Sequence, residues 1–323
     1  MRSATHAREL RKLGDGACMA GLSRTYVGTG RRVSWRQHYF YGMSNACSAA
    51  HGSCSPRQQL ARTPPRPAFA TTNAPKMDAS QILTAAVSGS ITPAEAALSL
   101  TAPVAAVLTD AEATENALWD TWTTVLAFAV RTNHEQQGPL VALVSNIKQL
   151  RGASGEAVTF EFWGQPTTWS ELPSFGPVLR EQYDVEYYAE GDGFVNFNAF
   201  AARLTADGVL DLSLYGIWTL RDALEDQLPD SSYAQTASRA LAAAAVWFLY
   251  AGHTMWELSK QNETLEGRVA APGKTVADKE WNGYNAERWA LWVERFKKVH
   301  EMGVKEDVRD VVQRALERTE EYA

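Results

Sequence analysis

The stretch RALAAAAVWFLYAGHTMWELSK, from Arg239 to Lys260, contains seventeen consecutive residues, Ala240 to Trp256, with almost no strongly polar side chain. A helix that spans a membrane needs about 20 predominantly apolar residues. This stretch is shorter, it is rich in alanine, which contributes little transfer free energy, and His253 lies near its carboxyl end. We therefore predict a helix buried in the core of a globular protein, with a face formed by Leu241, Ala245, Phe248, Gly252 and Met255.

The residues on both sides of this stretch also carry helical signals. Asp78 is placed to cap a first helix, and the segments TPAE (Thr92 to Glu95) and TDAE (Thr109 to Glu112) have the spacing of capping boxes. Apolar stripes at helical spacing are formed by Leu118, Trp122, Val125, Leu126 and Ala129; Phe197, Phe200, Ala201 and Leu204; Leu214, Ile217, Trp218, Arg221 and Leu224; Trp289, Trp292, Val293 and Phe296; and Val308, Val311, Val312, Ala315 and Leu316.

These patterns predict a single all-α domain over residues 77–323, built as an orthogonal or bundle-like set of helices. The segment 155–193 is less regular, because several glycines and prolines interrupt it. Its VTFEFW run, residues 158–163, is compatible with a short strand, but we predict a long ordered loop with one short helix. No alternation of strands and helices appears, which argues against a nucleotide-binding α/β sheet.

Charge divides the chain into two parts. Residues 1–76 contain twelve lysines and arginines against two acids, a net charge of +10, whereas residues 77–323 contain 19 basic and 35 acidic residues, a net charge of −16. The basic segment lacks the apolar core of a secretory signal and is predicted to be disordered; a mitochondrial transit peptide and a translation start at Met77 are the alternatives. We expect a cytoplasmic protein, or a mitochondrial one if the basic segment is a transit peptide.

The acidic body lacks the residues of several common chemistries. All three cysteines lie within residues 1–76, so the body has no thiolate nucleophile, disulfide or cysteine-ligated zinc. The segment GRVAAPGKT, Gly267 to Thr275, has five residues where a phosphate-binding loop has four, and no strand is expected before it. We therefore predict no metal and no cofactor, and the negative charge disfavours nucleic acid.

Two helical segments carry polar residues that invite a functional interpretation. Arg221 and Glu225 are one turn apart, as in an intrahelical ion pair, and Asn198 and Arg203 lie on the preceding predicted helix. These four groups are predicted to form a polar lock between helices. A ligand carboxylate bound by the two arginines is the alternative.

Two further motifs have a structural and a functional interpretation each. His253 and Glu257 share a helix face at the spacing of metal ligands, but no third ligand follows, so a surface hydrogen bond is favoured. The segment DVEYYAEGDG, residues 184–193, gathers acids around two tyrosines. It is predicted to be a solvated acidic loop, with a docking site for a basic partner as the alternative.

Three segments, GFVNFNAFAARLTADGVLDLSLYGIWTLRDALED, AAAAVWFLYAGHTMWELS and ERWALWVERFKKV, resemble the fungal domain-of-unknown-function family 3632 over roughly residues 115–300. The resemblance implies a helical, cytoplasmic-type domain and supplies no reaction. The matching positions are Asn196, Asn198, Ala199, Ala202, Arg203, Leu204, Trp218, Ala223, Leu224, Glu225, Trp247, Gly252, Arg288, Trp289 and Trp292.

Two functions are compatible with these observations. The first is a non-enzymatic interaction module that holds a protein partner on its acidic surface, away from membranes and nucleic acid. The alternative is a small-molecule pocket in which Arg203 and Arg221 bind a polar group, and an enzyme built on it would use His253 or Glu225 for proton transfer. That pocket would be lined by Trp218, Trp247, Tyr250 and Trp289.

Overall fold

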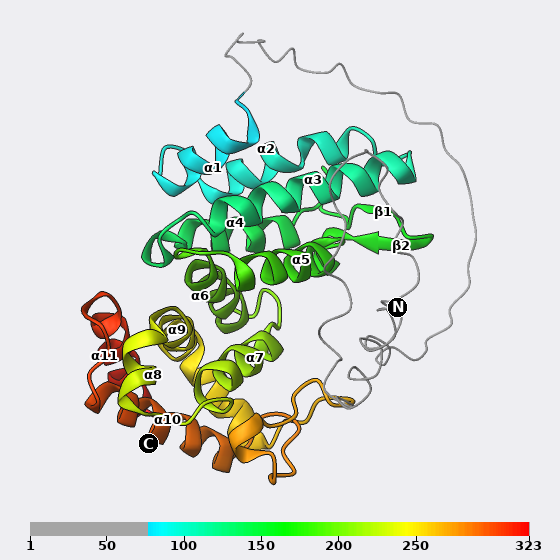
Figure 1. Ribbon diagram of the computed structural model, residues 1–323. Coiled ribbons are helices and arrows are strands. Elements are labelled where there is room, and N and C mark those ends of the chain that lie inside the picture. Colours follow the sequence, from blue (N-terminus) through cyan, green and yellow to red (C-terminus); the bar gives the residue numbers. More distant parts are fainter. Residues whose placement is uncertain (1–76, 323) are drawn as a thin grey trace, which may run out of the picture. The chain divides into compact units, whose positions relative to one another are not determined.

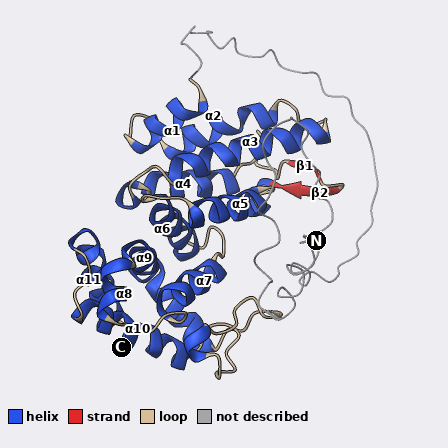
Figure 2. Cartoon of the chain, viewed as in Figure 1, coloured by secondary structure: helices blue, strands red, loops and turns tan. Residues whose placement is uncertain are grey.

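A computed structural model of the chain describes residues 77–322 (Figure 1). The predictions of a disordered segment, a transit peptide or a false start over residues 1–76 lie outside the described residues. The described part contains eleven α-helices and one small sheet, so the all-α prediction is confirmed (Figure 2). The helices are α1 (Ala79–Val87), α2 (Pro93–Ala105), α3 (Ala111–Ala129), α4 (Gly138–Lys148), α5 (Phe175–Tyr188), α6 (Gly193–Ala206), α7 (Ser213–Leu224), α8 (Ser231–Thr236), α9 (Ser238–Gln261), α10 (Ala286–Glu301) and α11 (Glu306–Glu320).

The alanine-rich stretch forms α9, which packs against α6, α7, α10 and α11 (Figure 1). Its alanines from 242 to 245 are nearly or completely buried, as are Trp247 and Phe248. The predicted face of this helix is buried throughout, so the prediction of a central core helix is confirmed. The small alanine side chains explain why α9 lies in the core, since they allow neighbouring helices to approach it closely.

The second organising helix is α6, which joins two groups of helices. It contacts α3, α4 and α5 on one side and α7 and α9 on the other. All but three of its fourteen residues are buried. The short first helices α1 and α2 pack on α3 and α4, which extends the core away from α9.

Helix starts follow the predicted caps with one exception. The side chains of Asp78 and Thr92 close capping boxes with Gln81 and Glu95. The third helix begins one residue later than TDAE predicts, because the carboxylate of Asp110 accepts the hydrogen bond from the amide of Ala113. A carboxylate at this position also interacts favourably with the positive end of the helix dipole.

The segment 155–193 corrects the prediction of a long loop with one short helix. Strands β1 (Thr159–Phe162) and β2 (Gln165–Thr168) form an antiparallel hairpin, and α5 extends over fourteen residues. Trp163 and Gly164 make the two-residue turn, both with positive φ, as expected for a tight hairpin turn. The sequence signal for the turn was weak, because tryptophan is an unusual residue in the left-handed region.

Helix α7 is rotated from its predicted orientation. Of the predicted stripe, Ile217 and Leu224 are buried, whereas Leu214, Trp218 and Arg221 are partly exposed. The buried face also contains Gly216, where an added Cβ would lie 3.0 Å from the indole of Trp247, together with Thr219, Leu220 and Ala223. Close contact between α7 and α9 therefore decides which side of α7 is buried.

We expect the Ala244→Leu substitution to destabilise the protein by about 1–3 kcal/mol or more, because the added atoms have no space in a fully buried helix face. Urea unfolding measures the change. The matched control is Ala102→Leu, the same substitution at an exposed position of α2, which is expected to stay within about 0.5 kcal/mol of the wild type. Equal effects at the two positions would contradict close packing around α9.

Candidate functional site

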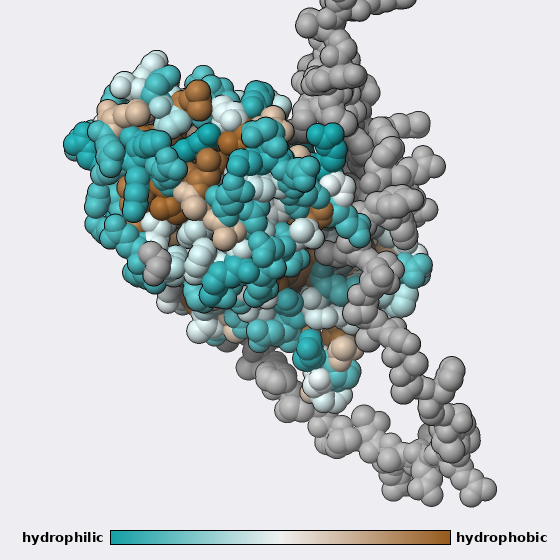
Figure 3. Space-filling view, turned by 90° about the horizontal axis from the view of Figure 1, so that it is seen from below, coloured by the Kyte–Doolittle hydropathy of each residue, from teal (hydrophilic) through white to brown (hydrophobic). Residues whose placement is uncertain are grey.

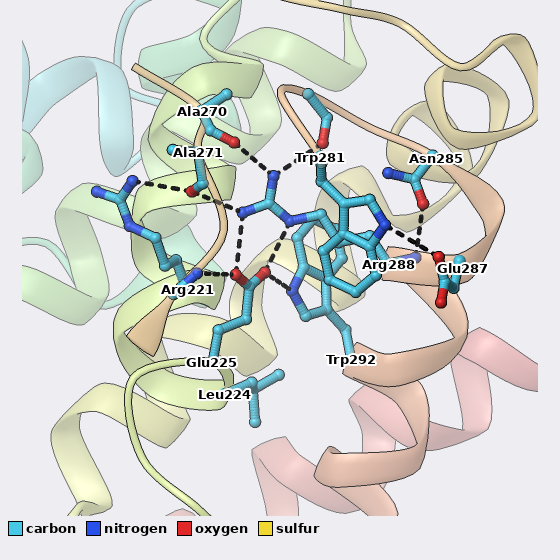
Figure 4. Close-up of polar contacts among 12 residues, drawn as sticks. Arg221, Leu224, Glu225, Ala270, Ala271, Trp281, Asn285, Glu287, Arg288 and Trp292 are labelled. Atoms are coloured by element: carbon cyan, nitrogen blue, oxygen red, sulfur yellow. Dashed lines mark hydrogen bonds and ion pairs between the residues drawn. The ribbon is translucent and has the colours of Figure 1, made fainter. Parts of the chain in front are cut away.

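Glu225, the residue that follows α7, is fully buried and accepts four hydrogen bonds through its carboxylate (Figure 4). Its Oε1 accepts hydrogen bonds from Nε of Arg288 at 2.7 Å and from Nε1 of Trp292 at 2.6 Å. Its Oε2 accepts from the amide of Gly273 at 2.7 Å and from Nη2 of Arg288 at 3.1 Å. A carboxylate offers about four acceptor positions, and all four are occupied.

The partner of this carboxylate, Arg288, is also fully buried and fully hydrogen-bonded. Besides its two bonds to Glu225, it donates through Nη1 to the carbonyls of Ala270 at 2.7 Å and Gly283 at 2.9 Å. A weaker bond joins its Nη2 to the carbonyl of Ala271 at 3.4 Å. These contacts use all five guanidinium N–H groups. The ion pair therefore connects α7 and α10 to the segment 262–285 between α9 and α10.

Close packing in the segment 262–285 requires glycine at two positions, one against Glu225 and one within the segment itself. A Cβ on Gly273 would lie 2.5 Å from the Cβ of Glu225, and one on Gly283 would lie 2.0 Å from the carbonyl oxygen of Glu263. Gly273 belongs to the GRVAAPGKT segment, which resembles a phosphate-binding loop in sequence but does not form one. Its glycine instead allows a backbone amide to reach a buried carboxylate.

A second arginine supports the same junction. Nη1 of Arg295 donates to the carbonyl of Leu224 at 2.7 Å and to Oγ1 of Thr275 at 2.6 Å. Burial lowers the pKa of this guanidinium from its ordinary value, and the nearby carboxylates of Glu225 and Glu294 oppose that effect. Because the normal value is far above neutral pH, we treat Arg295 as charged.

The predicted ion pair between Arg221 and Glu225 does not form. Helix α7 ends at Leu224, so Glu225 turns inward instead of continuing the helical face that carries Arg221. Arg221 donates instead to the carbonyl of Ala271 at 3.3 Å. The saturated carboxylate leaves no free position for a substrate proton, which favours a structural role for Glu225 over the predicted role in proton transfer.

Asn198 forms a separate polar centre among α6, α7 and α9. Its Oδ1 accepts hydrogen bonds from Oγ1 of Thr219 and from Nε1 of Trp247, both at 2.7 Å. Its Nδ2 donates to the carbonyl of Phe194 at 2.8 Å. Asn198 thus connects helices as a polar lock would, but its partners are not Arg203, Arg221 and Glu225, which corrects the predicted set.

Arg203 lies on the other side of α6 and stacks on an aromatic ring. Its guanidinium carbon is 3.7 Å from the ring centroid of Tyr250, and Nη2 donates to the carbonyl of His134 at 3.2 Å. The hydroxyl of Tyr250 and Nδ1 of His134 form a hydrogen bond of 2.7 Å. Burial is the main cause that lowers the pKa of His134 and raises that of Tyr250.

The remaining predicted residues have separate surroundings. Nε1 of Trp218 donates to the carbonyl of Val269 at 2.8 Å, and Trp289 packs against Phe248. His253 is mostly exposed, and its Nε2 lies 4.0 Å from Oε1 of Glu257, which is too far for the predicted hydrogen bond. A ligand-binding role for the aromatic set stays a prediction. The rings of this set, Trp218, Trp247, Tyr250 and Trp289, contact different partners, in turn Tyr183, Asn198, His134 and Phe248.

A carboxyl group that the sequence did not single out lies beside this region. The hydroxyl of Tyr187 on α5 donates to Oδ1 of Asp222 on α7 at 3.2 Å. Burial, with a smaller contribution from Asp226, raises the pKa of Asp222. Burial and Asp222 together raise the pKa of Tyr187 to about 12. No spacing motif marks this pair, because its members come from helices that meet only in the folded chain.

These contacts define a helical domain in which a fully hydrogen-bonded, buried ion pair joins α7, α10 and the segment 262–285. Residues 122–296 match the model of the family described as "Protein of unknown function (DUF3632)", and the chain belongs to this family. The match includes both Glu225 and Arg288, and it confirms the resemblance inferred from the sequence. No curated protein and no solved structure matches the chain.

Two searches of the described residues complete the site description. Within residues 77–322, no three histidine, aspartate or glutamate side chains gather in a way that would hold a metal ion. Among the helices of the same residues, none combines the length and apolar character that a membrane crossing demands.

The Glu225→Gln substitution is expected to cost about 3–5 kcal/mol of unfolding free energy, because it leaves the buried charge of Arg288 without its counter-ion. Urea unfolding followed by tryptophan fluorescence measures this. Glu257→Gln, which disrupts the exposed pair with Lys260, serves as the control and is expected to cost less than about 1 kcal/mol. A loss at position 225 as small as the control would show that the pair does not hold the junction.

The Asp222→Asn substitution is expected to stabilise the protein at neutral pH. The folded protein raises the pKa of Asp222 above its ordinary value of 3.8, so wild-type stability falls as the pH rises from that value through the folded-state pKa. Asparagine removes this loss and can still accept the hydrogen bond from Tyr187. Thermal unfolding across the acid range measures the difference, with exposed Asp278→Asn as the control. A variant advantage that does not grow with pH would contradict the assignment.

Proposed function

We propose that residues 77–323 form a non-enzymatic interaction module that binds a basic segment of a partner protein on the exposed face of α5. The observation that carries this proposal is an unusual pair of exposed apolar side chains. Val185 is 60% exposed and Tyr188 is 77% exposed. Together with Glu181 and Asp184 they have the spacing of one helical face, so two apolar groups lie next to two acidic ones.

The electrostatics of this face favour a cationic partner. Partial burial is the main cause that raises the pKa of Glu181, and the negative charge of Asp184 adds to it. The neighbouring Arg180 offsets only part of this charge, through an ion pair with Asp184 at 2.9 Å. A lysine or arginine of a partner would relieve the remaining repulsion. The face of the molecule seen in Figure 3 is mainly hydrophilic and also shows a group of hydrophobic residues.

The face is held rigidly, so a partner would lose little free energy in ordering it. On the opposite side of α5, Tyr183 is buried among aromatic rings, and Tyr187 binds Asp222. Arg239 closes the carboxyl end of the helix by donating to the backbone carbonyls of Tyr187 and Ala189. This support favours the alternative interpretation of the segment 184–193, a docking site, over a loop that is only solvated.

The alternative function, a small-molecule pocket lined by tryptophans and arginines, has less support, because several of these residues already have partners within the protein. Trp247 is fully buried, and its indole N–H is used by Asn198. Arg221 and Trp218 both donate to backbone carbonyls of the segment 262–285. We further infer a cytoplasmic location and no binding to nucleic acid, since the body lacks cysteine and carries a net negative charge.

Selection of a displayed library of random peptides against the full-length chain tests the proposal. Selected peptides are expected to combine lysine or arginine with an apolar side chain and to bind more weakly as the salt concentration rises. Tyr188→Ala is expected to weaken their binding at least about tenfold, as at an interface hot spot. The control is Leu98→Ala, which removes a similarly exposed apolar side chain from α2. Failure to select basic peptides, or equal losses in both variants, would refute the proposal.

A further inference from the structure

An open cleft of about 640 Å³ lies where the ends of α1, α3 and α4 meet α6. Its volume is within the range of small-molecule sites. Arg131, just after α3, and Arg203, on α6, both line it. None of the residues considered for the α5 face lies in this cleft, so it is a separate feature of the molecule.

Within residues 77–322 the side chains of these two arginines form no ion pair with a carboxylate, although the charge of Glu135 interacts electrostatically with that of Arg203. Arg131 is exposed, and its guanidinium makes no hydrogen bond or ion pair within residues 77–322. Arg203 donates one hydrogen bond, to the carbonyl of His134, and its Nε is buried without a partner. Glu135 is the acidic residue of the cleft, and Arg314 neutralises it through an ion pair of 2.6 Å.

The orientation of Arg203 is set by its surroundings. Its guanidinium stacks on Tyr250 at 3.7 Å, and Tyr250 is in turn held by its hydrogen bond with His134. A stacked guanidinium keeps its planar edge available for the bidentate binding of a carboxylate or phosphate. Arg203 is therefore prepared to bind an oxyanion in a way that a freely moving surface arginine is not.

The rest of the cleft suggests the remainder of the ligand. Val87, Phe128 and Pro139 are partly buried apolar residues of its lining. The amino end of α4 opens into the same space, where a Cβ on Gly138 would meet no atom within 4 Å. The volume is too large for an inorganic ion alone, and the lining offers apolar surface next to the charged groups.

We propose that this cleft binds a small organic oxyanion, a carboxylate or a phosphate monoester, with its charged group between Arg131 and Arg203. The uncharged part of the ligand lies against Val87, Phe128 and Pro139. The proposal is independent of the α5 face, because the two sites share no residue, and each can fail without the other.

Isothermal titration of the full-length chain with phenyl phosphate, benzoate and neutral benzamide tests this site. We expect one or both anions to bind with one-to-one stoichiometry and benzamide to bind at least about tenfold more weakly, since only the anions can pair with arginine. A preference for phenyl phosphate identifies a phosphate monoester as the ligand class, and a preference for benzoate identifies a carboxylate.

The Arg131→Ala variant locates the binding. Arg131 is exposed, so its removal leaves the fold intact, and we expect anion affinity to fall at least about tenfold. Arg268→Ala, which removes an exposed arginine outside the cleft, is the matched control and is expected to bind as the wild type does. The proposal is overturned if neither anion binds, if benzamide binds equally well, or if Arg131→Ala retains full affinity.

Discussion

The buried pair of Glu225 and Arg288 is the interaction on which the carboxyl-terminal half of the structure depends. Removing a carboxylate and a guanidinium from water costs several kcal/mol for each ion, and their attraction offsets this only when the remaining hydrogen-bonding groups are satisfied. Here every acceptor position of the carboxylate and every guanidinium N–H has a partner. Such saturation requires the segment 262–285 to lie where it does, and the segment has little regular structure of its own.

The alanines of α9 impose a second constraint, one of distance instead of charge. Small side chains leave room for α6 and α11 to approach, and the polar groups brought into the core by that approach are satisfied by Asn198. The charged junction lies at the carboxyl end of α7, whereas Gly216, nearer the amino end of the same helix, packs against Trp247 of α9. The ion pair and the alanine face are both buried. The two candidate binding surfaces, the exposed face of α5 and the cleft beside α6, lie on helices that this buried packing keeps in place.

Local features of the chain were predictable, and long-range partners were not. The buried face of α9 and the caps at Asp78 and Thr92 follow from spacing alone, which local physics determines, whereas the stripe predicted for α7 was wrong. Glu225 was paired in prediction with Arg221, its neighbour one turn away, whereas its partner Arg288 is 63 residues distant. Nothing in local spacing specifies a partner so remote.

The same reason accounts for the other differences between prediction and structure. The candidate residues of α6, α7 and α9 were correctly placed on neighbouring helices, but their pairing depends on how far each helix is rotated. The pairing of Asp222 with Tyr187 depends on the meeting of α5 and α7. The hairpin depends on two adjacent residues, Trp163 and Gly164, with positive φ, a conformation that tryptophan rarely adopts and that spacing rules do not anticipate.

The segment 262–285 is held largely through its backbone. Arg288 binds the carbonyls of Ala270, Ala271 and Gly283, and Glu225 binds the amide of Gly273. Main-chain groups are the same in almost every amino acid, so the anchoring is indifferent to most of the side chains that the segment carries. Away from its two close-packed glycines, the buried Ala270, Val276 and Tyr284, and Thr275, whose hydroxyl binds Arg295, this part of the molecule can accumulate substitutions while its path stays the same. A loop whose backbone path is fixed while its exposed side chains can change gives related proteins a way to diversify.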